Sequence, residues 1–504
     1  MLADIELTPA EHELCALLVR VADHVEQAQQ QALTLRIAGG WVRDKLLGQQ
    51  SHDLDVAVDR MSGYELAQHV HAYMGAHGLA THAVARISEN PARSKHLETA
   101  TTRVLGQLVD FVHLRSETYV DGTRIPRVAF GTPAEDARRR DITINALFYN
   151  LRTRRVEDFT GRGLDDLRAG VVRTPMEPAQ TFADDPLRVL RVLRFASRFG
   201  YEIEARTAAA LALPEIRDAL AAKISRERVG VEVDKMAAGA RPLMSIELVR
   251  RFGLYDTVFA PPAQLGRDGT DAGEPDEPAA EPDVTCAVEM TQCVLRILGS
   301  EPTELVARVP PQFAAGSARM RRLLVLAAYL APYAGRTGAD RKRRAPAALL
   351  VVRDALKLPA SDAAAVAAVH ALAPRVAAMA AACRVGAVPR DALGRLVRDA
   401  GERWPAAALY AAAAALRAGS AHCDVEQTHL AFVDAVCAAG LAEAYAFKHL
   451  VNGRDAAALL GCRPGPAIKP VLDRVMDWQL RNPAGSEREC REFILAEIAP
   501  GFRP

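Results

Sequence analysis

The chain of 504 residues has few cysteines, few aromatic residues and almost no net charge. Its eight cysteines form no CxxC pair and no Cys/His spacing typical of zinc, which excludes a disulfide framework and predicts reduced thiols inside a cell. The formal net charge of +1 gives no general attraction for nucleic acid, so any RNA contact has to come from local basic patches. With 50% hydrophobic residues, the chain can bury the cores of roughly three or four domains.

The sequence also lacks the signals that we would expect of a membrane or exported protein. We expect no apolar run to span a membrane. The segment Met1–Glu6 is acidic and contains neither a secretory apolar core nor an arginine-rich transit helix. We therefore expect a cytoplasmic protein, with a nuclear or mitochondrial pool left open.

What is present begins with a glycine turn ahead of two acids. Residues 35–38 predict a short buried strand, and Gly39 and Gly40 allow backbone N–H groups to approach a ligand closely. Residues 41–47 predict a helix whose start suits an anion, and Arg43 adds a charge suited to phosphate. We expect a triphosphate to bind at this turn.

The two acids alternate along a predicted strand. Asp53 and Asp55 lie two residues apart within 53–58, so they project from the same face and repel each other unless a cation lies between them. Asp110, in an apolar strand over 108–114, is the candidate third ligand. Hard oxygen ligands of this kind suit Mg²⁺ and a two-metal phosphoryl transfer. The alternative is that these acids simply end strands or cap helices.

A second block contains three adjacent arginines, residues 138–140, which cannot all face one ligand. Arg140 is the candidate contact to phosphate or ribose, and Arg139 is the candidate structural residue. We expect Asp141 to orient an arginine and Asn145 to meet a ribose hydroxyl. The alternative for an arginine run is a solvated face.

A further block places Asp185 and Arg188 three residues apart, on one helical face with Arg191 and roughly Arg194. Cytosine and adenine each offer an exocyclic amino donor, where uracil and guanine have a carbonyl oxygen. A carboxylate beside an arginine can therefore accept from C or A and disfavour U or G. The alternative is an ordinary salt bridge in an amphipathic helix.

Five sequence blocks occur in order: Gly39–Asp44 with Asp53 and Asp55, Arg139–Leu147, Asp158–Leu167, Asp184–Arg191, and Ser225–Arg228 with Glu232. Together these blocks resemble the class II tRNA nucleotidyltransferases, or CCA-adding enzymes, which share their catalytic head with bacterial poly(A) polymerases. The loop Ser94–Ala100 and parts of 452–483 are similar to eukaryotic and yeast-type members. The resemblance places base selection on Asp185 and Arg188, and nucleotide contacts on Arg191 and Arg194.

The resemblance implies an α+β protein in which a nucleotidyltransferase head with a mixed or antiparallel sheet precedes an all-helical neck, body and tail. We expect a catalytic head over 1–152 and a helical neck with the nucleotide-selecting motif over 153–258. An acidic linker rich in proline and glycine follows over 259–284. A helical body and tail that bind tRNA complete the chain over 285–504, and its oligomeric state is left open.

The expected reaction is addition of C, C and A from CTP and ATP to the 3′ end of tRNA, by metal-assisted attack of the 3′-hydroxyl on the α-phosphate. One alternative is a poly(A) polymerase of the same superfamily, and another is a catalytically silent RNA-binding protein. The intact Asp53, Asp55 and Asp110 argue against silence. The basic clusters at 319–322 and 341–344 are candidate RNA contacts, although such runs are more often solubilising.

Overall fold

The computed structural model describes residues 5–51, 53–87, 99–118, 127–260, 266–267, 283–301, 303–340 and 343–502. The chain divides into two compact units. Unit 1 comprises Met1–Glu232 and Arg251–Thr257, and unit 2 comprises Val233–Arg250 and Val258–Pro504. Residues 94–98 of the loop that resembles yeast-type members lie outside the described residues.

Unit 1 is built on a seven-stranded sheet of order β3-β4-β5-β2-β1-β8-β9. Strands β2 and β5 pair in parallel, and every other neighbouring pair in this sheet is antiparallel. The sheet is therefore mixed, as predicted. The strands are β1 (Leu35–Ala38), β2 (Leu54–Val58), β3 (Ala85–Ile87), β4 (Thr99–Val104), β5 (Gln107–His113), β8 (Phe148–Asn150) and β9 (Arg155–Glu157).

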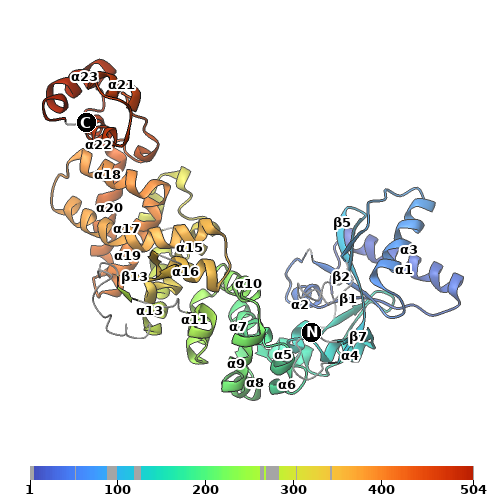
Figure 1. The fold of residues 1–504 in the computed structure, drawn as a ribbon. Coiled ribbons are helices and arrows are strands. Elements are labelled where there is room, and N and C mark those ends of the chain that lie inside the picture. The colour runs from blue at the N-terminus through green and yellow to red at the C-terminus, as the bar shows by residue number, and fades with distance from the viewer. Residues whose placement is uncertain are drawn as a thin grey trace. The chain divides into compact units, whose positions relative to one another are not determined.

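Period-two alternation gives this sheet one apolar face. Leu54, Val56 and Val58 of β2 are buried, and helices α1 (Pro9–Gln29) and α3 (Gly63–Ala76) pack side by side against the sheet (Figure 1). Helix α1 begins with a capping box formed by Thr8 and Glu11. The helices therefore cover one face and leave the other for the acids.

Besides the seven-stranded sheet, unit 1 contains helices and two small two-stranded sheets. The antiparallel pair is β6 (Arg115–Thr118) with β7 (Arg127–Phe130), and the parallel pair is β10 (Val171–Val172) with β11 (Glu202–Ile203). The helices up to the unit boundary are α2 (Gly40–Leu46), α4 (Pro133–Arg138), α5 (Gly163–Ala169), α6 (Pro178–Asp184), α7 (Leu187–Phe199), α8 (Ala205–Leu211), α9 (Pro214–Lys223) and α10 (Arg226–Ala237).

Unit 2 is almost entirely helical and ends in a small core around α21 to α23 (Figure 1). A three-stranded sheet interrupts the helices: β12 (Gly266–Arg267), β13 (Arg336–Asp340) and β14 (Arg343–Pro346). The remaining helices are α11 (Pro242–Arg251), α12 (Tyr255–Phe259), which begins in the Arg251–Thr257 part of unit 1, α13 (Val284–Leu298), α14 (Glu304–Arg308), α15 (Ala318–Tyr329), α16 (Ala347–Leu350), α17 (Ala360–Val385), α18 (Arg390–Ala400), α19 (Trp404–Arg417), α20 (His422–Ala438), α21 (Gly453–Leu459), α22 (Lys469–Arg481) and α23 (Glu487–Phe493).

Helix α17 corrects one sequence expectation. This helix of 26 residues is long and apolar enough to cross a membrane by length and composition, so the prediction that no run reaches that limit was wrong. Alanine-rich helices pass this test even when they are core helices. Here α17 packs against α15, α19 and α20, and residues such as Val366 and Val376 are fully buried. One helix of this kind is weak support for a membrane span.

Parts of the predicted linker and basic clusters fall outside the described residues. Within 259–284, Gly266 and Arg267 pair with β13, and residues 261–265 and 268–282 are not described. The four-part division into head, neck, linker and body stays a prediction. Of the basic candidates, Arg322 forms ion pairs with Asp234 and Asp362, which occupies its charge, and residues 341–342 are not described.

Candidate active site

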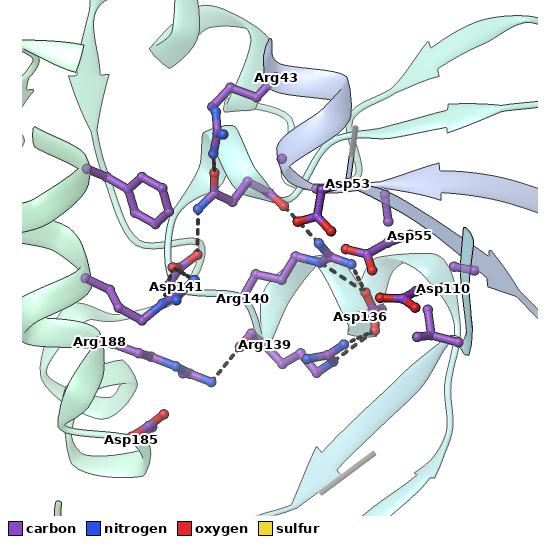
Figure 2. A pocket seen from close by; sticks show the side chains of 18 of the residues that line it. Arg43, Asp53, Asp55, Asp110, Asp136, Arg139, Arg140, Asp141, Asp185 and Arg188 are labelled. Carbon is purple, nitrogen blue, oxygen red and sulfur yellow. Dashed lines mark hydrogen bonds and ion pairs between the residues drawn. The ribbon is translucent and has the colours of Figure 1, made fainter. Parts of the chain in front are cut away.

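Three carboxylates gather on the open face of the sheet (Figure 2). Asp53 immediately precedes β2, and Asp55 lies opposite Asp110 in the parallel β2–β5 register. One ligand oxygen from each of the three lies within 4.8 Å of the others. Hard oxygen donors at this spacing fit a divalent cation. The predicted convergence of Asp53, Asp55 and Asp110 is therefore present in the fold.

The electrostatics of Asp55 fit the same conclusion. Burial raises the pKa of Asp55 to about 6, and the neighbouring charge of Asp53 adds to that effect. Thr101, on the neighbouring strand β4, donates a hydrogen bond to Asp110. A cluster of three acids gains stability from a bound cation.

The glycine turn is shaped by a neighbouring arginine. Gly39 has φ +74°, and a Cβ there would lie 2.8 Å from Nη1 of Arg140. A side chain at Gly39 is thus excluded both by the backbone and by Arg140. The N–H of Gly39 donates to the carbonyl of Leu147 at 3.0 Å, so this donor is already used and is not free for an anion.

Arg43 is more deeply held than the sequence suggested. Its side chain is buried, donates to Asp44 at 2.8 Å and to Asn145, and lies over the rings of Phe195 and Phe199. Although Arg43 lines the cavity, these partners occupy its guanidinium. Its expected contact to phosphate stays a prediction.

The arginine run is divided by Asp136, which the sequence argument did not select. Asp136 is 1% exposed and accepts from both Arg139 and Arg140, the latter at 2.8 Å. Burial by itself would raise the pKa of Asp136, but the two arginines outweigh it and lower the pKa to about 2. Figure 2 shows Arg140 pointing toward the acids while Arg139 lies beyond Asp136. The spacings i,i+3 and i,i+4 from Asp136 are the signal that could have identified it.

Asp141 makes the expected contact with an arginine. Its carboxylate accepts from Nε of Arg191 at 2.8 Å and from Nδ2 of Asn145 at 3.1 Å. Burial opposes ionisation, but Arg191 and Asn145 outweigh it and lower the pKa of Asp141 to about 2. Asn145, in a 3₁₀ turn over Thr143–Asn145, also accepts from Arg43. Its amide is therefore an internal link, and its role toward ribose stays a prediction.

Asp185 and Arg188 both line the cavity, but they do not form the expected pair. Asp185 lies just before α7 and accepts from Nη2 of Arg228 at 2.9 Å. Arg188 donates to the carbonyl oxygens of Thr181 at 3.3 Å and Arg139 at 2.6 Å. The alternative of a simple Asp185–Arg188 salt bridge is therefore wrong: Asp185 has extended backbone angles and lies before the helix, and its carboxylate pairs with Arg228 instead.

Further along α7, Arg191 and Arg194 share an acid from α10. Arg194 donates to the buried Glu232, Nη1 of Arg191 lies 3.8 Å from the same carboxylate, and Arg194 stacks on Phe195. All thirteen predicted site residues line a single cavity of about 630 Å³ in unit 1. They are Gly39, Gly40, Arg43, Asp53, Asp55, Asp110, Arg140, Asp141, Asn145, Asp185, Arg188, Arg191 and Arg194.

Known proteins resemble the chain along its whole length. Residues 35–173 match the Poly A polymerase head domain. The chain is 36% identical over 525 residues to a relative from Saccharomyces cerevisiae named "CCA tRNA nucleotidyltransferase, mitochondrial", covering 99% of this chain and 94% of the relative. The chain belongs to the CCA tRNA nucleotidyltransferase family.

Other members of this family support the same assignment. "tRNA nucleotidyltransferase cca1" from Schizosaccharomyces pombe is 32% identical, and the alignment covers 97% of each chain. Among solved structures, a CCA-adding enzyme in apo form is 22% identical with a TM-score of 0.64, covering 98% of this chain and 97% of that one. A Thermotoga maritima CCA-adding enzyme complexed with tRNA is 20% identical with a TM-score of 0.61, covering 98% and 96%. These structures confirm the α+β fold.

The cavity also contains residues of this family member that sequence reasoning did not assign to the site. Besides Asp136, these include Arg139, expected to be only structural, and Arg228, which was noted only within the last block. Arg228 lies on α10, 43 residues beyond Asp185 in the chain. No local periodicity connects residues at that separation, and only the resemblance to the last block could have indicated it.

Proposed function

We propose that this protein adds C, C and A from CTP and ATP to the 3′ end of tRNA. The observation that carries the proposal is that the carboxylates Asp53, Asp55 and Asp110 share one cavity with the base-reading candidates Asp185 and Arg188. Catalytic acids and nucleotide-selecting groups within one cavity suit a polymerase that selects its nucleotide without a nucleic-acid template.

In the reaction, the oxygen of the tRNA 3′-hydroxyl forms a bond to the α-phosphorus of CTP or ATP, and the bond to the leaving pyrophosphate breaks. Asp53, Asp55 and Asp110 would hold the divalent cation, for which we propose Mg²⁺ because hard carboxylate oxygens and phosphates suit it. When bound, the ion neutralises charge on the reacting phosphates. Arg140, which points toward these acids, is the candidate contact to the triphosphate (Figure 2).

Base selection rests on Asp185 and Arg188. The Asp185 carboxylate would accept from N4 of cytosine or N6 of adenine, and it would meet the carbonyl oxygen of uracil or guanine unfavourably. Arg188 would exchange a backbone carbonyl for a ring acceptor of the base. A site built on such hydrogen bonds rejects a mismatch because the mismatch leaves buried polar groups unpaired.

The test uses tRNA transcripts that end before CCA, after the first C and after CC, each incubated with one nucleotide at a time. Addition of C to the first two and of A to the third is expected. Poly(A) tails on all three would favour a poly(A) polymerase of the same superfamily, and no extension would favour a silent RNA-binding protein.

Two finer assignments belong to this proposal. We propose a mitochondrial pool beside the cytoplasmic one, because relatives from Saccharomyces cerevisiae and Candida glabrata carry "mitochondrial" in their names. Fractionation of cells that express a tagged full chain tests the mitochondrial pool.

Replacing Mg²⁺ with other divalent ions in the incorporation assay tests the identity of the metal.

A further inference from the structure

Helix α10 supplies a second row of charges behind the nucleotide-selecting helix α7. Arg228, in the first turn of α10, donates through Nη2 to Oδ2 of Asp185 at 2.9 Å and through Nη1 to Oδ1 at 3.4 Å. Glu232, one turn later, accepts from Arg194 and lies 3.8 Å from Nη1 of Arg191. Each charge on this face of α10 thus meets an opposite charge that belongs to the proposed nucleotide site.

Asp185 has few other restraints. It lies between α6 and α7 with extended backbone angles, φ −136° and ψ 95°, rather than inside a helix. The backbone N–H of Leu187 donates to its Oδ1 at 3.2 Å. In the described part of the chain, the cation paired with Asp185 is Arg228, whereas Arg188 donates to backbone carbonyls.

We propose that Arg228 is a specificity-determining positioning residue that holds the Asp185 carboxylate aimed into the cavity. This role rests on the proposed function, because Asp185 must be the acceptor for the amino group of C or A. Each carboxylate oxygen has two lone pairs, so Asp185 can accept from Arg228 and from a base at the same time.

The guanidinium geometry explains why an arginine suits this position. Its planar fork presents two donors to two carboxylate oxygens, which fixes rotation of the carboxylate as well as its location. Without Arg228, the Leu187 N–H restrains only one oxygen. The carboxylate can then turn away from the base edge, and an incoming uracil or guanine carbonyl no longer meets a fixed negative charge.

The test is single-nucleotide incorporation with all four triphosphates on one tRNA, using the full-length enzyme. We expect Arg228→Ala to raise the relative use of UTP over CTP by about tenfold and to raise KM for CTP more than it lowers kcat. Arg228→Lys should recover part of the discrimination, because it restores the charge without the fork. The matched control is Arg226→Ala, which removes an arginine of the same helix that donates to the carbonyl of Thr257 at 2.9 Å and does not line the cavity.

A double-mutant comparison separates positioning from a general loss of structure. If Arg228 acts through Asp185, adding Arg228→Ala to Asp185→Ala should leave the nucleotide ratios of Asp185→Ala unchanged. If Arg228→Ala loses activity equally with every nucleotide and keeps the nucleotide ratios, the positioning role of Arg228 is overturned, while the proposed function stands. Failure of the wild-type enzyme to extend tRNA with C or A would instead overturn the proposed function, and the positioning role with it.

Discussion

Replacing Asp136 by asparagine tests how the site holds its arginines. Asp136 is buried and accepts from Arg139 and Arg140, and its pKa is lowered from 3.8 to about 2. At about 1.4 kcal/mol for each pKa unit, the ionised carboxylate contributes on the order of 2 kcal/mol at neutral pH. Breaking a buried ion pair by removing one partner costs about 3 to 5 kcal/mol. Because an amide oxygen still accepts, we expect Asp136→Asn to cost about 2 to 4 kcal/mol.

The pH dependence has a definite sign. A lowered carboxyl pKa stabilises the fold fully above the unfolded value of 3.8, and this stabilisation is lost as pH falls through about 2. The difference between wild type and Asp136→Asn should therefore be constant near neutral pH and shrink to roughly half by pH 3. Urea denaturation followed by circular dichroism at both pH values measures it. Asp165→Asn, at an exposed pair with Arg168, is the matched control and should change little.

Activity provides the second measurement. Arg140 loses a partner in Asp136→Asn, and Arg139, whose carbonyl accepts from Arg188, loses one too. Small displacements of positioning groups cost about 100-fold in rate, so we expect C incorporation to fall by about 10- to 100-fold. A variant as stable as wild type at pH 7, with full incorporation, would refute the view that Asp136 organises this part of the cavity.

Four further outcomes are expected. Asp53→Ala or Asp55→Ala should abolish incorporation but keep tRNA binding and the melting temperature, and a large fall in melting temperature would support a structural role for these acids. Because the metal-free pKa of Asp55 is raised to about 6, the chelated protein should melt at a lower temperature as pH rises from 5 to 7, and Mg²⁺ should reverse this; a melting temperature independent of pH would contradict it. Arg188→Ala should raise misincorporation of UTP or GTP relative to CTP by about 10- to 100-fold, measured with all four triphosphates, and unchanged ratios would refute base reading by this residue. Gly163→Ala should cost about 1 to 3 kcal/mol in urea denaturation, because its Cβ would lie 2.8 Å from the carbonyl oxygen of Thr143, and wild-type stability would show that this packing can relax.

The local sequence pattern was enough to predict the glycine turn and the placement of the two acids that follow it. Alternation over β2 placed Asp53 and Asp55 on one face, and the glycine turn preceded a helix as expected. These features depend on neighbours within a few residues, where the period of the backbone fixes the direction of side chains. The order of the motifs was likewise enough to predict the family and the mixed sheet.

The tertiary structure decided which charges meet. Register between β2 and β5 puts Asp110 opposite Asp55, and the return of α10 gives Asp185 its partner Arg228 rather than Arg188. Packing likewise brings Asn145 to Arg43 as an internal partner, and the contact of Arg43 to phosphate stays a prediction. Such pairings join residues far apart in the chain, and their geometry depends on how strands and helices pack, which local periodicity does not encode.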